Sequence, residues 1–206
     1  MEEVKKTNEV IVSGQIASGY VFSHEIYGEK FYMFDLAVNR MSGAVDVIPV
    51  MISERITDVT RNAIDDFVII EGQYRSYNKR VGERSKLVLY VFAAEIKPTE
   101  SFELNFNYIG LEGTICKPVI YRKTPLGREV ADILVAVNRP YGKFDYIPCI
   151  AWGRTAHFAD TLKVGQKIKL EGRVQSRTYQ KKHEDGTVED RLAYEVSTIK
   201  LMLLEE

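Results

Sequence analysis

The alternation of apolar and polar residues is clearest between residues 130 and 152. Two apolar runs, 130–137 and 146–152, lie on either side of a short polar turn that contains Pro140 and Gly142. Both runs are rich in β-branched and aromatic residues, and the residues between them are typical of turns, so the pattern predicts a β-hairpin. A weaker version of the same hairpin pattern occupies residues 34–53.

The two hairpins belong to a longer internal repeat, which must be recognised before any fold is assigned. Segments of the first half return at a constant offset of 99 residues: VSG at 12–14 with LEG at 111–113, Gly28 with Gly127, LAVNR at 36–40 with VAVNR at 135–139, and DVIP at 46–49 with DYIP at 145–148. After one inserted residue, IEG at 70–72 matches LEG at 170–172, and RSYNK at 75–79 resembles RTYQK at 177–181. This collinear order indicates a tandem duplication.

Each copy is expected to hold five strands and one short helix. In the first copy we expect an opening strand at 9–20, the hairpin, a helix at 54–66, and strands at 67–77 and 86–97. In the second copy the corresponding segments are 108–121, the hairpin, 154–162, 166–180 and 191–204. Five short strands in this order are typical of the OB-fold. The predicted fold class is therefore all-β with one short helix per domain, as two tandem five-stranded OB-fold Greek-key barrels.

A polar segment separates the two copies. Lys97-Pro98-Thr99-Glu100-Ser101 has the signals of a linker, because proline ends a strand and polar residues surround it. A chain of 206 residues is long enough for two domains of about 100 residues each. We predict an N-terminal OB-fold domain at 1–98 and a C-terminal OB-fold domain at 105–206.

The composition excludes several classes of protein. Hydrophobic content of 45% and charged content of 28% are ordinary for a globular protein, and no apolar stretch approaches the roughly 20 residues of a membrane span. The N-terminus lacks the apolar core of a secretory signal, and Cys116 and Cys149 have no CxxC spacing. His24, His157 and His183 are scattered, with neither a metal-ligand spacing nor a Gly-rich phosphate loop. We therefore expect a cytoplasmic, non-enzymatic protein without metal, cofactor or catalytic residues.

Aromatic and basic side chains gather around the second hairpin. Arg139 closes its first strand, and Tyr141, Phe144, Tyr146 and Trp152 follow around the turn and along its second strand. Cations beside flat rings on a sheet suit a chain of stacked bases over a phosphate backbone. Because the net charge is −1 and the sequence pI is about 6.4, nucleic-acid binding would require basic residues to be gathered locally.

The second copy resembles the bacterial single-stranded-DNA-binding protein family over nearly its whole length. The residues that carry the resemblance are Gly113, TPLG at 124–127, AVNRP at 136–140, DYIP at 145–148, AWGRTA at 151–156 and EGRVQSRTY at 171–179. The first copy follows more loosely, through Gly14, AVNR at 37–40, IP at 48–49 and EG at 71–72. The resemblance implies OB-folds that bind single-stranded DNA (ssDNA) without sequence preference, by aromatic stacking and basic contacts.

On the positions that match the family, the resemblance implies stacking by Tyr141, Tyr146, Trp152 and Tyr179, and basic contacts by Arg122, Lys123, Arg139, Arg173 and Arg177. We add Lys181 and, from the first copy, Arg40, Arg75, Tyr77 and Lys79 to the candidate DNA-binding residues. Trp152 could instead be a core residue. Arg40 and Arg139 could instead form salt bridges with Asp46 and Asp145 on the facing strands. We retain both arginines as phosphate contacts, because such pairs are expected to be exposed and to contribute little.

The predicted function is sequence-independent binding and protection of ssDNA in DNA replication, recombination or repair. The family's usual unit has four OB-folds, so we expect a homodimer, formed through the free edges of the first strands. Family members usually continue into a flexible region with an acidic tip that recruits replication and repair enzymes. This sequence stops at LLEE, residues 203–206, so tail-mediated recruitment is not expected. Two alternatives stay open: an OB-fold interaction or architectural module that has lost most DNA affinity, and an OB-fold that binds RNA or tRNA.

The two copies are not expected to share the DNA equally. At the constant offset, Ser42, Val47 and Ser53 stand where the second copy has Tyr141, Tyr146 and Trp152, and Tyr77 is matched with Tyr179. Each lost stack is worth about 1–3 kcal/mol by alanine substitution. The basic residues of the first copy, Arg75, Lys79, Arg80 and Arg84, are expected to attract phosphate, while tight contacts concentrate on the second copy.

Overall fold

The computed structural model of the protein describes residues 7–100, 106–182 and 186–205. The first half contains strands β1 (Asn8–Ile16), β2 (Val21–Ile26), β3 (Glu29–Asn39), β4 (Val45–Ser53), β5 (Phe67–Val81) and β6 (Arg84–Pro98). The second half contains β7 (Asn107–Ile115), β8 (Ile120–Lys123), β9 (Glu129–Arg139), the 3-10 turn η1 (Pro140–Gly142), β10 (Lys143–Trp152), helix α1 (Arg154–Asp160), β11 (Lys167–Lys182) and β12 (Val188–Leu203). Ser101 of the predicted linker and His183 lie outside the described residues.

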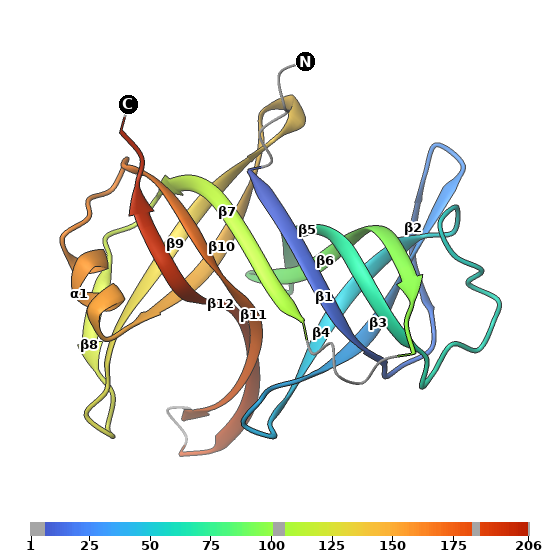
Figure 1. Ribbon diagram of the computed structural model, residues 1–206, viewed down its shortest axis with the longest axis horizontal. Coiled ribbons are helices and arrows are strands. Elements are labelled where there is room, and N and C mark those ends of the chain that lie inside the picture. The colour runs from blue at the N-terminus through green and yellow to red at the C-terminus, as the bar shows by residue number, and fades with distance from the viewer. Residues whose placement is uncertain (1–6, 101–105, 183–185, 206) are drawn as a thin grey trace.

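Each half closes into a barrel (Figure 1). In the first barrel the strands neighbour one another in the order β1, β3, β4, β6, β5 and back to β1, and in the second in the order β7, β9, β10, β12, β11 and back to β7. The pairs β4–β6 and β10–β12 are parallel, and the other pairs in these closed circuits are antiparallel. This is the five-stranded Greek-key arrangement of an OB-fold, which confirms the predicted fold class.

The opening strand of each copy is broken into two pieces. β1 ends at Ile16 and β7 at Ile115, and the short outer strands β2 and β8 then pair with β3 and β9. The predicted opening strands at 9–20 and 108–121 therefore cover nearly all of β1 and β7 and extend into the connections that follow, the second as far as the start of β8.

The prediction of a helix in both copies is wrong for the first. In the second copy, α1 packs Ala156 and Ala159 into the core. In the first copy, residues 54–66 form a series of turns. Asp58 accepts a hydrogen bond from the Thr60 backbone N–H at 3.0 Å, and Asn62 accepts one from the Ile64 N–H at 3.2 Å. Short polar side chains that bond the backbone two residues ahead compete with helical hydrogen bonds, so this segment turns instead of coiling.

The cores of the two barrels follow the same alternation along the repeated strands. Leu36 and Val38 on β3 are buried, as are their counterparts Val135 and Val137 on β9. Successive side chains of a strand point to opposite faces, so the residues between these positions lie on the outer face of each barrel. The duplicated apolar pattern thus produces two equivalent interiors.

A glycine opens a β-bulge at the same place in both barrels. The register between β5 and β6 shifts between Glu71 and Gly72, and the register between β11 and β12 shifts between Glu171 and Gly172. A Cβ at Gly72 would lie 2.1 Å from the Phe92 carbonyl oxygen, and one at Gly172 would lie 2.2 Å from that of Ser197. No side chain fits at these contacts, which explains the glycine at this position in both copies.

The first strands of the two barrels pair with each other within one chain. β1 and β7 are antiparallel, with Val10 opposite Ile109 and Asn8 opposite Leu111. This pairing joins the barrels into one continuous sheet, and β1 and β7 lie side by side between them in Figure 1. The expectation that these strands offer free edges for dimerisation is therefore wrong: their edges already satisfy each other inside the monomer.

Two buried carboxylates brace the barrels against each other. Asp46 of the first barrel accepts the Ser176 backbone N–H of the second at 2.7 Å, and Asp145 of the second accepts the Ser76 N–H of the first at 2.6 Å. Both aspartates are fully buried. Because each carboxylate bonds a backbone group of the other barrel, the two bridges are reciprocal.

These bridges also identify the true structural counterparts. Ser76 corresponds to Ser176, since both donate to an aspartate of the other barrel. Counting along the strands from these serines, Tyr77 corresponds to Arg177 and Lys79 to Tyr179. The sequence match of Tyr77 with Tyr179 was therefore displaced by two residues, and Tyr77 is not the counterpart of that ring.

Candidate nucleic-acid interface

The second strand of the hairpin presents an aromatic outer face. Along β10, Asp145, Ile147 and Cys149 point inward and are buried, whereas Tyr146 is 40% exposed. Trp152, at the end of the strand, keeps 37% of its surface exposed. The alternative interpretation of Trp152 as a core residue is therefore excluded.

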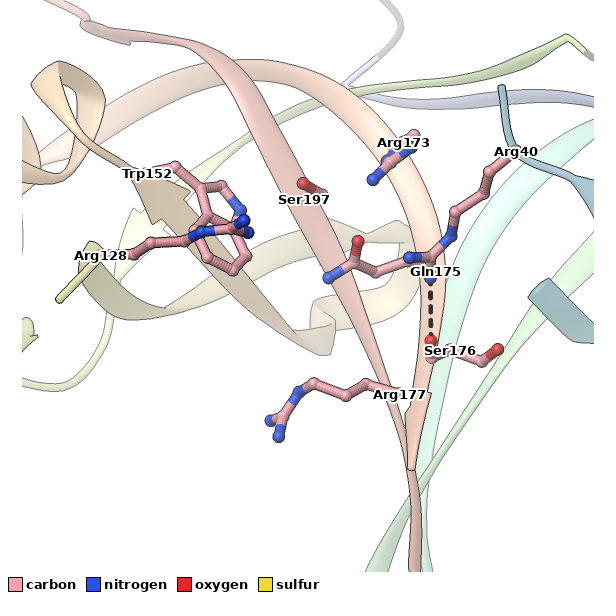
Figure 2. A pocket seen from close by; sticks show the side chains of 8 residues that line it. All are labelled: Arg40, Arg128, Trp152, Arg173, Gln175, Ser176, Arg177 and Ser197. Atoms are coloured by element: carbon pink, nitrogen blue, oxygen red, sulfur yellow. Dashed lines mark hydrogen bonds between the residues drawn. The ribbon is translucent and has the colours of Figure 1, made fainter. Parts of the chain in front are cut away.

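A groove of about 410 Å³ runs beside Trp152, and Figure 2 shows the side chains that line it. The lining residues are Arg40, Arg128, Trp152, Arg173, Gln175, Ser176, Arg177 and Ser197. Trp152 comes from the end of β10, Arg128 from the turn before β9, and Arg173 and Arg177 from β11. Four guanidinium groups and one indole thus surround a single groove, although the chain as a whole carries a net charge of −1.

A buried glutamate holds the floor of this groove in place. Glu195 on β12 accepts hydrogen bonds from Gln175 at 2.8 Å and from Arg177 at 3.3 Å. Arg177 nevertheless stays 47% exposed and lies over the Tyr179 ring, with its guanidinium carbon 5.6 Å from the ring centroid. Arg177 is thereby positioned as a fixed, outward-facing cation next to an aromatic surface, which suits contact with a nucleotide phosphate and its base.

Arg40 and Arg139 take the salt-bridge role instead of standing free. Arg40 donates from Nε to Asp46 at 2.7 Å and forms a second, short bond to the same carboxylate, and Arg139 lies 3.4 Å from Asp145. The hydrogen bond to Asp46 raises the pKa of Arg40. These pairs are not exposed as assumed, because both carboxylates are buried. Arg139 does not line the groove beside Trp152.

The remaining basic candidates are spread over other surfaces. Arg122 on β8 makes a two-point pair with Asp132, at 2.7 and 3.2 Å, and Lys123 lies 3.7 Å from Glu129. Lys79 is exposed on β5. Lys181 belongs to β11, but its side chain lies outside the described part of the structure.

Tyr141 is the most exposed of the candidate rings. It is 98% exposed in the turn between β9 and β10 and adopts a left-handed backbone conformation, with φ of 63°. Few non-glycine residues take this conformation, because it is strained. At Tyr141 the ring makes no contact with the core. Tyr141 is therefore available to a ligand along the same hairpin as Tyr146 and Trp152.

The family of the chain follows from comparison with known proteins. The model of the single-strand binding protein family matches residues 106–202. Single-stranded DNA-binding protein B of Bacillus subtilis is 33% identical over 88 residues, which make up 39% of this chain and 76% of that protein. The chain belongs to the single-strand binding protein family.

Other members extend this likeness. Single-stranded DNA-binding protein 3 of Listeria innocua is 37% identical over 81 residues, which make up 36% of this chain and 51% of that protein. The chain spans about half the length of most of the curated family members it matches. The crystal structure of wild-type single-stranded DNA binding protein from Thermus aquaticus has a TM-score of 0.75, covering 97% of this chain and 93% of that one at 20% identity, a likeness of fold.

The family match falls on the second barrel, and the outer face of the first barrel is different. Phe31 stacks with His24 at 5.1 Å between ring centroids and contacts Phe92 at 5.9 Å. The guanidinium carbon of Arg75 lies 3.7 Å from the centroid of the Phe92 ring. Burial, and to a lesser extent the positive charge of Arg139, lowers the pKa of Arg75. The rings and the cation of this face are therefore already paired with one another.

Tyr77 also has a partner in the first barrel, since its ring meets Tyr90 edge-on at 5.8 Å. Arg75 and Tyr77 were both candidates from the sequence, yet the structure brings neither into the groove beside Trp152.

Sequence reasoning missed Arg128 and the ring cluster of the first barrel. The signal for Arg128 was present in the predicted hairpin: Trp152 pairs with Val130, so a residue two positions before Val130 must flank the indole. Phe31 and Phe92 carried no comparable signal, because β6 is brought beside β4, the hairpin partner of β3, only by the barrel's strand order. Among the described residues, no cluster of His, Cys, Asp and Glu could hold a metal ion, and no helix is long and apolar enough to span a membrane.

Proposed function

We propose that the protein binds single-stranded DNA without sequence preference and protects exposed strands during replication, recombination or repair. The observation that carries the proposal is the groove of the second barrel, where four arginines surround the half-exposed Trp152. Arginines neutralise phosphates irrespective of sequence, and an indole stacks on any base because every base has a π-face. Membership of the single-strand binding protein family supports the same activity.

In this proposal the second barrel makes the tight contacts. Trp152, Arg128, Arg173 and Arg177 form the centre of the interface, and Tyr141, Tyr146 and Tyr179 extend it along β10 and β11. The activity requires no metal, cofactor or catalytic residue.

Fluorescence titration tests the proposal directly, because Trp152 is the single tryptophan of the chain and reports on the groove itself. Adding poly-dT should quench its emission, and the affinity should fall with salt by a slope of roughly −0.7 per neutralised phosphate. Poly-U as a competitor separates DNA binding from RNA binding. Absence of both quenching and a gel shift at low salt would favour the alternative of an interaction or architectural module.

We also propose that two chains associate into a homodimer with four OB-fold barrels, and that each chain is divided into domains at 1–98 and 105–206. The first-strand edges are used within the chain, so association requires another surface. β12 ends in a group of exposed apolar side chains, Ile199, Met202 and Leu203, that supports such a contact. A mass of 23.6 kDa by light scattering at all concentrations would contradict the dimer.

The two free cysteines, Cys116 and Cys149, agree with a reducing cytoplasm.

A further inference from the structure

The groove of the second barrel contains a side chain from the first. Arg40 follows β3 of the first barrel, yet it lines the same groove as Trp152 and Arg173 (Figure 2). The crossing is possible because the two barrels are held together at this point by the bridge between Asp46 and the Ser176 backbone.

Arg40 is held in the groove by groups from both barrels. Its Nε donates to Asp46 at 2.7 Å, and its Nη2 donates to Asp46 and, at 3.0 Å, to the Ser176 carbonyl oxygen of the second barrel. A guanidinium has five N–H donors, and these bonds use Nε and Nη2 only. Within the described residues, Nη1 makes no hydrogen bond, and the side chain remains 22% exposed. The guanidinium is thus fixed in orientation while one of its nitrogens keeps both donors.

We propose that the DNA groove is a composite site, in which Arg40 of the first barrel binds a phosphate of the strand held by the second barrel. This inference rests on the proposed function. The two N–H donors of Nη1 can bond phosphate oxygens, and a group already oriented by Asp46 and Ser176 loses little freedom when it binds. The first barrel then contributes to the affinity of the second through one fixed cation.

The chain supplies a matched control for this role. Arg139 is the repeat counterpart of Arg40, paired with buried Asp145 in the other bridge. Arg139 lies near Arg75 of the first barrel, whose pKa its charge lowers. Arg139 does not line the groove beside Trp152. Removing either arginine takes a charged partner from a buried aspartate, but only Arg40 borders the proposed DNA path.

The experiment compares two pairs of variants by poly-dT titration at several salt concentrations. Asp46→Asn is compared with Asp46→Asn/Arg40→Met, and Asp145→Asn with Asp145→Asn/Arg139→Met. With the aspartate already neutral, removing the arginine leaves no unpaired buried carboxylate, so all four chains should keep their fold. Circular dichroism and the thermal midpoint check this for each chain.

Adding Arg40→Met should lower affinity about tenfold at low salt, as expected for one lost hydrogen bond to a charged group, and should reduce the salt slope by about 0.7. Adding Arg139→Met should change affinity by no more than about twofold and leave the slope unchanged. Equal effects in the two pairs, or an unchanged slope without Arg40, would overturn the composite groove while leaving DNA binding itself intact. Failure of the unmodified chain to bind poly-dT would instead overturn the proposed function, and the composite groove with it.

If a methionine variant does not fold, Arg40→Lys tests the same proposal. Lysine keeps the charge but not the oriented N–H donors of Nη1, so the salt slope should be retained while affinity falls. An equal loss of affinity in Arg139→Lys, whose residue lies outside the groove, would mean that the arginine acts only through the bridge.

Discussion

The outer faces of the two barrels differ far more than their interiors do. At the position of Trp152 the first barrel has Ser53, since the two residues occupy the same register opposite Val130 and Phe31. Two residues before those partners stand Arg128 in the second barrel and Glu29 in the first. Where the second barrel has cations around an indole, the first barrel has a glutamate that accepts a hydrogen bond from a serine.

The first barrel carries aromatic residues on its outer face at other positions than the second barrel does. Phe31 and Phe92 bring rings to its outer face, where Phe92 is covered by Arg75. A ring already stacked on a neighbour offers less surface to a base, and a desolvated arginine offers fewer donors to a phosphate. The comparison teaches that counting aromatic and basic residues does not identify a binding face, because what matters is how much of each ring and guanidinium stays open to a ligand.

The largest expected difference between the barrels concerns the two bridges. Asp46 accepts two bonds from Arg40 and one each from the Ser176 N–H and hydroxyl. Asp145 accepts the Ser76 N–H and one longer contact from Arg139, and its Oδ2 makes no hydrogen bond in the described structure. We expect Asp46→Ala to lower the free energy of unfolding by roughly 3 kcal/mol, the scale for breaking a buried pair. Asp145→Ala should cost less. Urea denaturation measures both, and a larger loss for Asp145→Ala would contradict this account.

The next effect concerns DNA affinity. Trp152→Ala should weaken poly-dT binding by about 1–3 kcal/mol, because it removes the exposed ring of the groove. Phe92→Ala, in the first barrel, should have a clearly smaller effect, since that ring is covered by Arg75. Gel-shift titration is the suitable measurement, because the first variant has no tryptophan fluorescence. Equal losses would mean that the two faces bind DNA alike.

A smaller effect is expected in the core. Tyr74 corresponds to Val174, since Asn8 and Asn107 bond the backbones of these two residues in the same way. Its ring is fully buried, its hydroxyl has no partner in the described structure, and burial raises its pKa. Tyr74→Phe removes an unsatisfied buried hydroxyl and should increase the free energy of unfolding by about 1 kcal/mol. Tyr141→Phe, on an exposed ring, serves as the control and should change little.

The smallest effect is a dependence of stability on pH. Burial raises the pKa of Asp145 above its ordinary value of 3.8, against the opposing influence of the Ser76 N–H and Arg139. The folded state therefore holds this proton more tightly than the unfolded state, and the resulting stabilisation is present below the ordinary pKa and is lost as the pH rises through the raised one. Asp145→Asn should remove this part of the pH profile. The profile is measured by urea denaturation from about pH 3 to about pH 7, which includes the range in which carboxyl groups titrate. An identical profile in the variant would show that Asp145 does not titrate differently on folding.

The sequence by itself was sufficient for the features that depend on local patterns and on the repeat. Alternating apolar residues and turn-forming residues predicted the hairpin of β9 and β10, and the constant offset predicted two barrels of one topology. The exposed position of Tyr141 also followed from its polar turn. These features are local because strand periodicity and turn chemistry act over a few neighbouring residues.

Only the tertiary structure decided how distant segments meet. The sequence suggested free first-strand edges, but β1 and β7 close on each other, which hides backbone groups that would otherwise remain unpaired. It also suggested exposed pairs for Arg40 and Arg139, but the joined barrels bury both aspartates. The same joining brings Arg40 into the groove of Trp152, more than 100 residues away in the chain. Such contacts are set by the register of strands far apart in sequence, which no local pattern of residues contains.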